Sequence, residues 1–224
     1  LFVLTAAYST LAGLWGVLVT DFFQFILAMA GCIALAYFAL GAVGGMSGLL
    51  AALHTRFPDD APLQLIPSLD SAWMPALTFF VYLAVNWWAS WYPGAEPGGG
   101  GYVAQRIFST KNERHALLAA LWFNIAHYAL RPWPWIIVAL ASMVLYPGLA
   151  DPESGYVKVM VDHLPPFWRG FLIAAFFAAY MSTISTQLNW GASYLVNDVY
   201  RRFWAPDNSE AHYARAGRVA TLLM

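Results

Sequence analysis

The polar side chains best placed to do chemistry lie on one stripe of a long apolar segment, residues 174–202. At about 100° per residue in a helix, four of them fall within roughly 60° of one another. These are Ser182, Thr186, Asn189 and Ser193, with Thr183 on the adjacent flank. Uncharged oxygen ligands suit a hard monovalent cation stripped of water. The stripe therefore indicates a cation site within a membrane helix, or else hydroxyls that only join helices together.

A second apolar segment is interrupted at residues 93–101, where the sequence reads PGAEPGGGG. Proline and glycine at this density cannot hold an α-helix. Irregular backbone at membrane depth is tolerated only where it is buried in protein or lines a watery cavity. Such a break is typical of transporter binding sites. The alternative is that two helices end at an ordinary loop.

Two further polar features stand in apolar surroundings. Asn124, His127 and Arg131 share one helix face, which we expect to face the protein interior because an intramembrane arginine is costly without a partner or water. In the alternative, Arg131 reaches toward the interface or pairs structurally beside the sequence RPWP. Asp21 is a lone carboxylate near the cytoplasmic end of its segment. It is either an interfacial residue near a helix N-terminus or a cation ligand.

The composition shows which solvent surrounds the chain. Hydrophobic residues make up 60% and charged residues only 10% of its 224 residues, which is far more apolar than a soluble domain. The sequence therefore predicts a polytopic membrane protein. Its single cysteine, Cys32, excludes a disulfide framework within the chain and a cysteine-based metal site.

Hydropathy predicts an all-α chain whose residues 1–224 form one transmembrane domain. Full spans are expected at about residues 16–44, 72–108, 115–146 and 167–200, with the end of one span before them and the start of another at about 211–224. Small residues predict a turn over residues 7–14. Because the chain begins and ends within apolar segments, we interpret it as an internal fragment.

Basic residues concentrate in the loops after the second and fourth full spans, whereas the alternate loops carry most of the acids. By the positive-inside rule, the basic loops are cytoplasmic. The first and fourth full spans are thus expected to cross the membrane in opposite directions.

Three sequence elements resemble the sodium:solute symporter family, which includes sodium/glucose, proline and pantothenate carriers. They are YSTLAGLWGVLVTDFFQ at residues 8–24, YVAQR at residues 102–106 before a basic loop, and AAYMSTISTQLN at residues 178–189 followed by NDVYR at 197–201. The resemblance implies a leucine-transporter-type inverted repeat of five plus five helices. These residues would span the end of the fourth to the beginning of the ninth core helix.

The resemblance also implies ion ligands. The family's main sodium site uses one backbone carbonyl and two hydroxyls, which match Ala179, Ser182 and Thr183, with its other ligands on the first core helix, outside these residues. Some relatives bind a second sodium through a carboxylate and two hydroxyls. These match Asp21, Ser185 and Thr186.

We therefore expect a sodium-coupled secondary transporter, not an enzyme, that imports a small polar solute by alternating access. Sodium is the coupling ion and no other cofactor is expected. The expected partners are the solute, with a sugar among the candidates, and membrane lipid, but no nucleic acid. The expected location is the plasma (inner) membrane, as a multi-pass protein. Residues expected on the solute side are Asn86, Trp91, Glu96, Asn124 and His127.

Two alternative functions stay open at this point. One is a multispan membrane enzyme acting on a lipid-linked substrate, with His127 and either Glu96 or Asp198 as acid and base groups. The other is a transporter-like sensor. Sugar specificity is itself in question, because the run WYPGAEPGGGG departs from the pattern of the sugar carriers.

Overall fold

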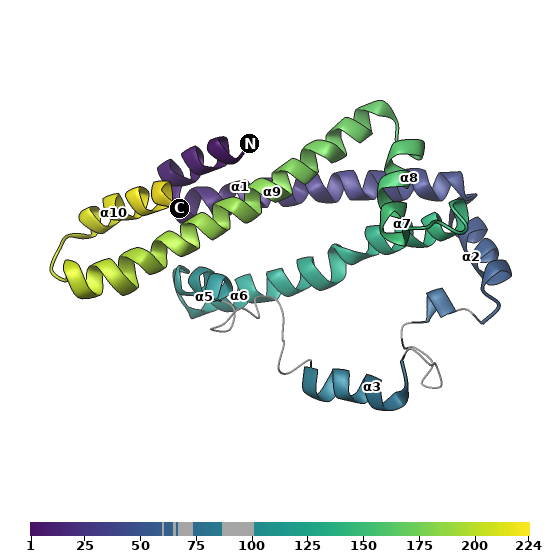
Figure 1. Ribbon diagram of the computed structural model, residues 1–224, viewed down its shortest axis with the longest axis horizontal. Coiled ribbons are helices and arrows are strands. Elements are labelled where there is room, and N and C mark those ends of the chain that lie inside the picture. The colour runs from purple at the N-terminus through teal and green to yellow at the C-terminus, as the bar shows by residue number, and fades with distance from the viewer. Residues whose placement is uncertain (60, 65, 67–73, 87–100) are drawn as a thin grey trace. The chain divides into compact units, whose positions relative to one another are not determined.

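The computed structural model describes residues 1–59, 61–64, 66, 74–86 and 101–224, and every regular element in those ranges is a helix (Figure 1). The α-helices are α1 (Phe2–Ala42), α2 (Gly45–Arg56), α3 (Ala76–Val81), α5 (Gly101–Phe108), α6 (Glu113–Asn124), α7 (Pro132–Leu145), α8 (Gly155–His163), α9 (Pro166–Tyr194) and α10 (Glu210–Leu223). Short 3-10 helices are η1 (Ala61–Leu63) and η4 (Pro152–Ser154), and π-helical segments are η2 (Tyr82–Asn86), η3 (Ile125–Leu130) and η5 (Leu195–Trp204). The expected all-α class is confirmed.

Among the described residues, three helical stretches are long and apolar enough to cross a membrane: Gly13–Ala42, Glu113–Leu145 and Pro166–Trp204. They overlap the spans expected at 16–44, 115–146 and 167–200. The span expected at 72–108 includes residues 87–100, which lie outside the described ranges. The division into four full spans therefore stays a prediction.

The break near the start of α1 is sharper than the sequence indicates. Instead of a turn over residues 7–14, the chain stays helical on both sides of Gly13, which alone has a non-helical backbone (φ 59°, ψ −160°). A residue with a Cβ rarely adopts this positive φ, so glycine is what permits the break.

The described residues form two compact units. The first combines Leu1–Leu35 with Leu164–Met224 and contains α9, α10 and most of α1, whereas the second is Ala36–His163. In the first unit, α10 packs on the end of α9 and on η5 (Figure 1). Tyr213 is buried there against Ala192 and Val196, and its hydroxyl donates to the Ala205 carbonyl at 2.6 Å.

The second unit is organised around α7, which contacts both α2 and α8. The approach of α8 is close, because a Cβ added to Gly155 would lie 2.8 Å from the Ser142 hydroxyl. Three polar side chains reinforce it. The Tyr146 hydroxyl donates to the Asp162 carboxylate at 2.8 Å, and Lys158 Nζ lies 3.3 Å from the same carboxylate oxygen.

We expect Tyr146→Phe to weaken the attachment of α8 in a pH-dependent way. The bond from Tyr146, followed by that from Lys158, lowers the pKa of Asp162 below its ordinary value. A lowered folded-state pKa stabilises the fold above the unfolded pKa, and this contribution is lost as pH falls through the folded value. The difference in melting temperature between wild type and variant should thus be present at pH 7 and disappear in acid. A difference that does not vary with pH would contradict this role.

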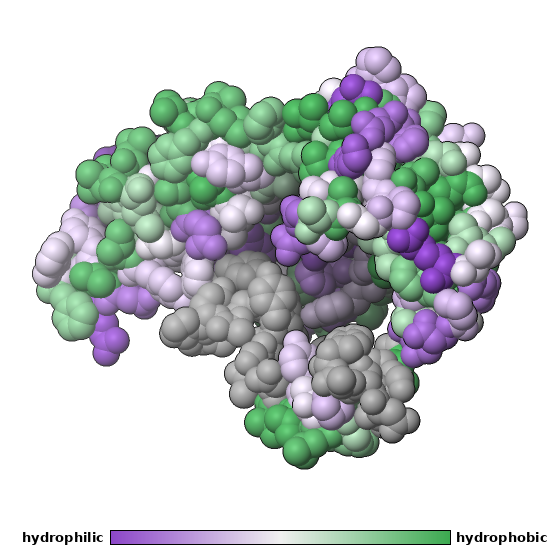
Figure 2. All heavy atoms as spheres, turned by 45° about the vertical axis from the view of Figure 1, so that its right-hand side comes forward, coloured by the Kyte–Doolittle hydropathy of each residue, from purple (hydrophilic) through white to green (hydrophobic). Residues whose placement is uncertain are grey.

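Large apolar side chains cover much of the surface, as the space-filling view shows (Figure 2). Val3 and Trp15 on α1, for example, are 78% and 76% exposed. Such exposure would be a liability in water but is expected where lipid is the solvent. The chain is an integral membrane protein.

Candidate functional site

The hydroxyl stripe lies on α9, which is helical without interruption from Pro166 to Tyr194. The helix therefore holds the predicted ligands at fixed angles around one axis. Thr183 lies on the exposed flank, Ser182 is partly buried, and Ser185 on the opposite flank is fully buried. The stripe thus runs from the surface of the first unit into its interior.

One contact brings two predicted ion-binding residues together from distant parts of the chain. The Ser182 hydroxyl on α9 donates to the Asp21 carboxylate on α1 at 2.6 Å, across 161 residues of sequence. This is the length of a strong, charge-assisted hydrogen bond. Asp21 therefore faces α9 rather than acting as an isolated interfacial charge.

Helix packing maintains this contact. A Cβ added to Gly31 on α1 would lie 2.8 Å from the Leu172 Cδ1 on α9, so the two helices approach closely there. Between the Asp21–Ser182 contact and the Gly31–Leu172 contact, residue numbers rise by ten along α1 and fall by ten along α9. The two helices are therefore antiparallel over this stretch, as expected for spans that cross in opposite directions.

Gly31 and Leu172 were not expected to matter from the sequence. A glycine inside an apolar helix indicates a close approach of some kind, but the sequence does not name the partner. Both residues act here by setting the distance between α1 and α9.

Two further hydroxyls of the predicted site donate their protons within α9 itself. Thr183 donates to the Ala179 carbonyl at 3.1 Å, and Ser185 donates to the Ser182 carbonyl at 3.0 Å. A hydroxyl that gives its proton to a carbonyl keeps its oxygen lone pairs for a cation. Thr186 lies one turn beyond Ser182 on the same face. The arrangement can therefore present several oxygens and one carboxylate to a monovalent cation.

The residues expected on the solute side belong to the second unit where they are described. Asn124 ends α6 and donates its amide to the Ala120 carbonyl at 2.8 Å. His127 lies in η3, stacked on Phe123 with ring centroids 5.1 Å apart. Asn86 is the last residue of η2. The other two, Trp91 and Glu96, lie outside the described residues, as does most of the break at 93–101.

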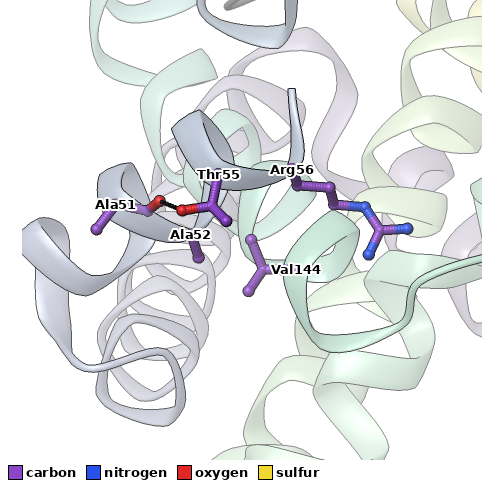
Figure 3. A pocket seen from close by; sticks show the side chains of 5 residues that line it. All are labelled: Ala51, Ala52, Thr55, Arg56 and Val144. Carbon is purple, nitrogen blue, oxygen red and sulfur yellow. Dashed lines mark hydrogen bonds between the residues drawn. The ribbon is translucent and has the colours of Figure 1, made fainter. Parts of the chain in front are cut away.

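A shallow hollow of about 410 Å³ lies between α2 and α7 (Figure 3). Ala52 and Val144 supply apolar surface, and the Thr55 hydroxyl already donates to the Ala51 carbonyl at 2.8 Å. Arg56 is its one charged lining residue. This lining contains none of the predicted site residues and does not indicate a solute site.

Comparison with known proteins finds relatives that are all named as sodium-coupled carriers. A model of the sodium:solute symporter family matches residues 1–224. The chain is 26% identical over 264 residues to sodium/glucose cotransporter 4 of Danio rerio and 28% identical over 259 residues to sodium/myo-inositol cotransporter 2 of Homo sapiens. It is 25% identical over 224 residues to the sodium/proline symporter of Staphylococcus aureus (strain JH9).

These alignments cover 100%, 100% and 97% of this chain, but only 37%, 36% and 40% of the respective relatives. The chain thus spans less than half the length of the curated relatives that it matches.

Proposed function

This chain belongs to the sodium:solute symporter family, and we propose that the protein imports a small polar solute by coupling its entry to the downhill movement of sodium. The matching relatives are named as cotransporters and symporters, which favours transport over the membrane-enzyme alternative.

The observation that carries the proposal is the 2.6 Å bond between Ser182 and Asp21. A carboxylate inside a membrane-spanning pair of helices is costly unless it meets a compensating charge. The neighbouring side chains on α9 provide several uncharged oxygens beside this carboxylate. One carboxylate together with hydroxyl oxygens is a ligand set that suits a hard monovalent cation, because the hydroxyls complete its shell without adding charge of their own.

The two ion sites then share one helix. Ala179, Ser182 and Thr183 would hold the main sodium together with ligands from the first core helix of the family. Exposure of Ala179 and Thr183 leaves room for such ligands. Asp21, Ser185 and Thr186 would hold a second sodium deeper in the first unit, with Ser182 between the two sites.

For the solute we propose a small polar molecule, without choosing among sugars, inositol and amino acids. Asn86, Asn124 and His127 would contact it, together with Trp91 and Glu96. Sodium binding would favour the outward-open state, and solute binding would then permit one repeat to move against the other.

The test is solute uptake into proteoliposomes containing the full-length protein, with and without a sodium gradient. Thr183→Val removes a ligand oxygen, and an unmade polar interaction in a buried site costs about 1–3 kcal/mol. It should therefore raise the sodium concentration for half-maximal uptake by about tenfold. Thr183→Ser keeps the oxygen and should have a mild effect.

Ser142→Ala on α7 is the control, because its hydroxyl also donates to a carbonyl of its own helix, Ala139, at 2.7 Å. It should leave sodium dependence unchanged. Solute uptake that does not depend on the sodium gradient would contradict the proposal.

A further inference from the structure

Arg131 places a full positive charge near the middle of a membrane-spanning stretch. That stretch runs from Glu113 to Leu145, so Arg131 lies 18 residues from one end and 14 from the other. At 1.5 Å per residue these are about 27 Å and 21 Å. With the stretch centred in a core about 30 Å thick, Arg131 is roughly 12 Å from the nearer boundary. An arginine side chain does not reach that far, which argues against interfacial snorkelling.

The backbone around Arg131 is distorted. Its N–H donates to the Ala126 carbonyl, five residues back, at 3.0 Å, which closes the π-helical segment η3. Pro132 follows directly and has no N–H for the next helical bond, so the wider turn accommodates it. Such π-helical turns inside α-helices are frequent at functional sites.

The side chain has an aromatic neighbour but no counter-ion among the described residues. Its guanidinium lies 5.0 Å from the centre of the Trp135 ring, and its buried Nε has no hydrogen-bond partner. Of the ion pairs recorded in the described ranges, none includes Arg131. A guanidinium stacked on a ring uses its flat face and keeps its in-plane N–H groups for an acceptor.

The geometry points to a planar monoanion as that acceptor. A carboxylate fits the two parallel N–H groups of a guanidinium, and its single charge matches one arginine. A phosphate carries more charge and generally collects several donors. His127 lies four residues earlier on the same side of the chain, where its ring could contact the rest of a bound molecule.

We propose that Arg131 binds the carboxylate of the transported solute, so that the solute class is a small polar carboxylate. This inference rests on the proposed symport function and narrows its substrate. The site is completed only when the solute arrives, because Arg131 has no counter-ion among the residues that the structure describes.

The first test needs no knowledge of the solute. In the purified full-length protein without solute, Arg131→Met should melt at the same temperature as wild type or a few degrees higher, because it removes an unpaired buried charge. Arg201→Met is the contrast, since Arg201 pairs with Glu210 at 3.0 Å and lies over the Tyr213 ring. It should melt lower. A fall of several degrees in Arg131→Met would reveal a permanent internal counter-ion and overturn the proposal.

The second test uses matched probes that differ in one carboxylate: glucuronate with glucose, and lactate with propane-1,2-diol. In sodium, an acid should raise the melting temperature of wild type and bind on the order of a hundredfold more tightly than its neutral counterpart. Arg131→Gln should abolish this preference, and Arg131→Lys should retain part of it. Equal binding of acid and neutral probe, or an acid preference that survives in Arg131→Gln, would overturn the inference.

Sodium alone separates this inference from the function on which it rests. Stabilisation by sodium without solute should persist in Arg131→Gln, because the ion ligands are on α1 and α9. If sodium has no effect on wild type either, the symport proposal fails. If all four probes are inert, the melting temperature of Arg131→Met decides the inference.

Discussion

Replacing Asp21 by asparagine is expected to raise the sodium concentration for half-maximal uptake by between about tenfold and a hundredfold. Asp21 is the carboxylate that accepts the Ser182 hydroxyl at 2.6 Å, and asparagine keeps its shape while removing its charge. Loss of an interaction with a charged group costs about 1.5–3 kcal/mol, and 1.4 kcal/mol is tenfold in affinity. The measurement is the sodium dependence of uptake by the full-length protein in proteoliposomes. Asp207→Asn, in the exposed turn before α10, is the control and should be neutral.

A double-mutant cycle with Ser182→Ala tests whether Asp21 and Ser182 act together in sodium binding. Because the Ser182 hydroxyl donates to Asp21 and lies between the two proposed sodium sites, the effect of the double variant should be clearly smaller than the sum of the two single effects in free energy. Purely additive losses would argue against this coupling. An unchanged sodium dependence in both single variants would exclude this helix pair as the sodium site.

Placing leucine at Gly31 is expected to destabilise the protein more than any other single change considered on α1. A Cβ alone would lie 2.8 Å from the Leu172 Cδ1 and 3.5 Å from the Leu172 Cα, and Leu172 is fully buried. A larger side chain forces α1 and α9 apart, at a cost of about 1–3 kcal/mol or more. Because the same two helices carry Asp21 and Ser182, sodium affinity should fall together with the melting temperature.

Gly41→Leu is the matched control, because a Cβ at Gly41 meets no heavy atom within 4 Å. It changes the same residue type on the same helix and should be tolerated. Leu172→Ala in the Gly31→Leu background should recover part of the lost stability by returning space to the contact. A Gly31→Leu protein with normal melting and sodium affinity would show that this approach does not position the site.

Local patterns in the sequence determined the class of protein and one face of the site. Composition and hydropathy predict a helical membrane protein, because apolar stretches of this length are stable only as helices in lipid. The hydroxyl stripe on residues 174–202 follows from helical periodicity alone, since residues within one helix have fixed angles. The family could be identified for the same reason, because its motifs are short and contiguous.

Other local details of the backbone could not be predicted from the sequence. A turn was expected over residues 7–14, but the non-helical backbone is confined to Gly13. The sequence RPWP is preceded by the π-helical segment η3, whose wider turn no sequence pattern specifies. Hydrogen-bond register within a helix depends on small differences in backbone energy that residue type alone does not fix.

What only the tertiary structure decided is which residues meet across helices. From its own helix alone, Asp21 could be an interfacial charge or a cation ligand. The bond to Ser182 shows that its carboxylate faces α9. That bond depends on the antiparallel register of α1 and α9, which the close approach of Gly31 to Leu172 maintains. The period of a helix is set by its own backbone. The register between two helices is set by side-chain packing among residues that are more than a hundred positions apart, and no local pattern encodes it.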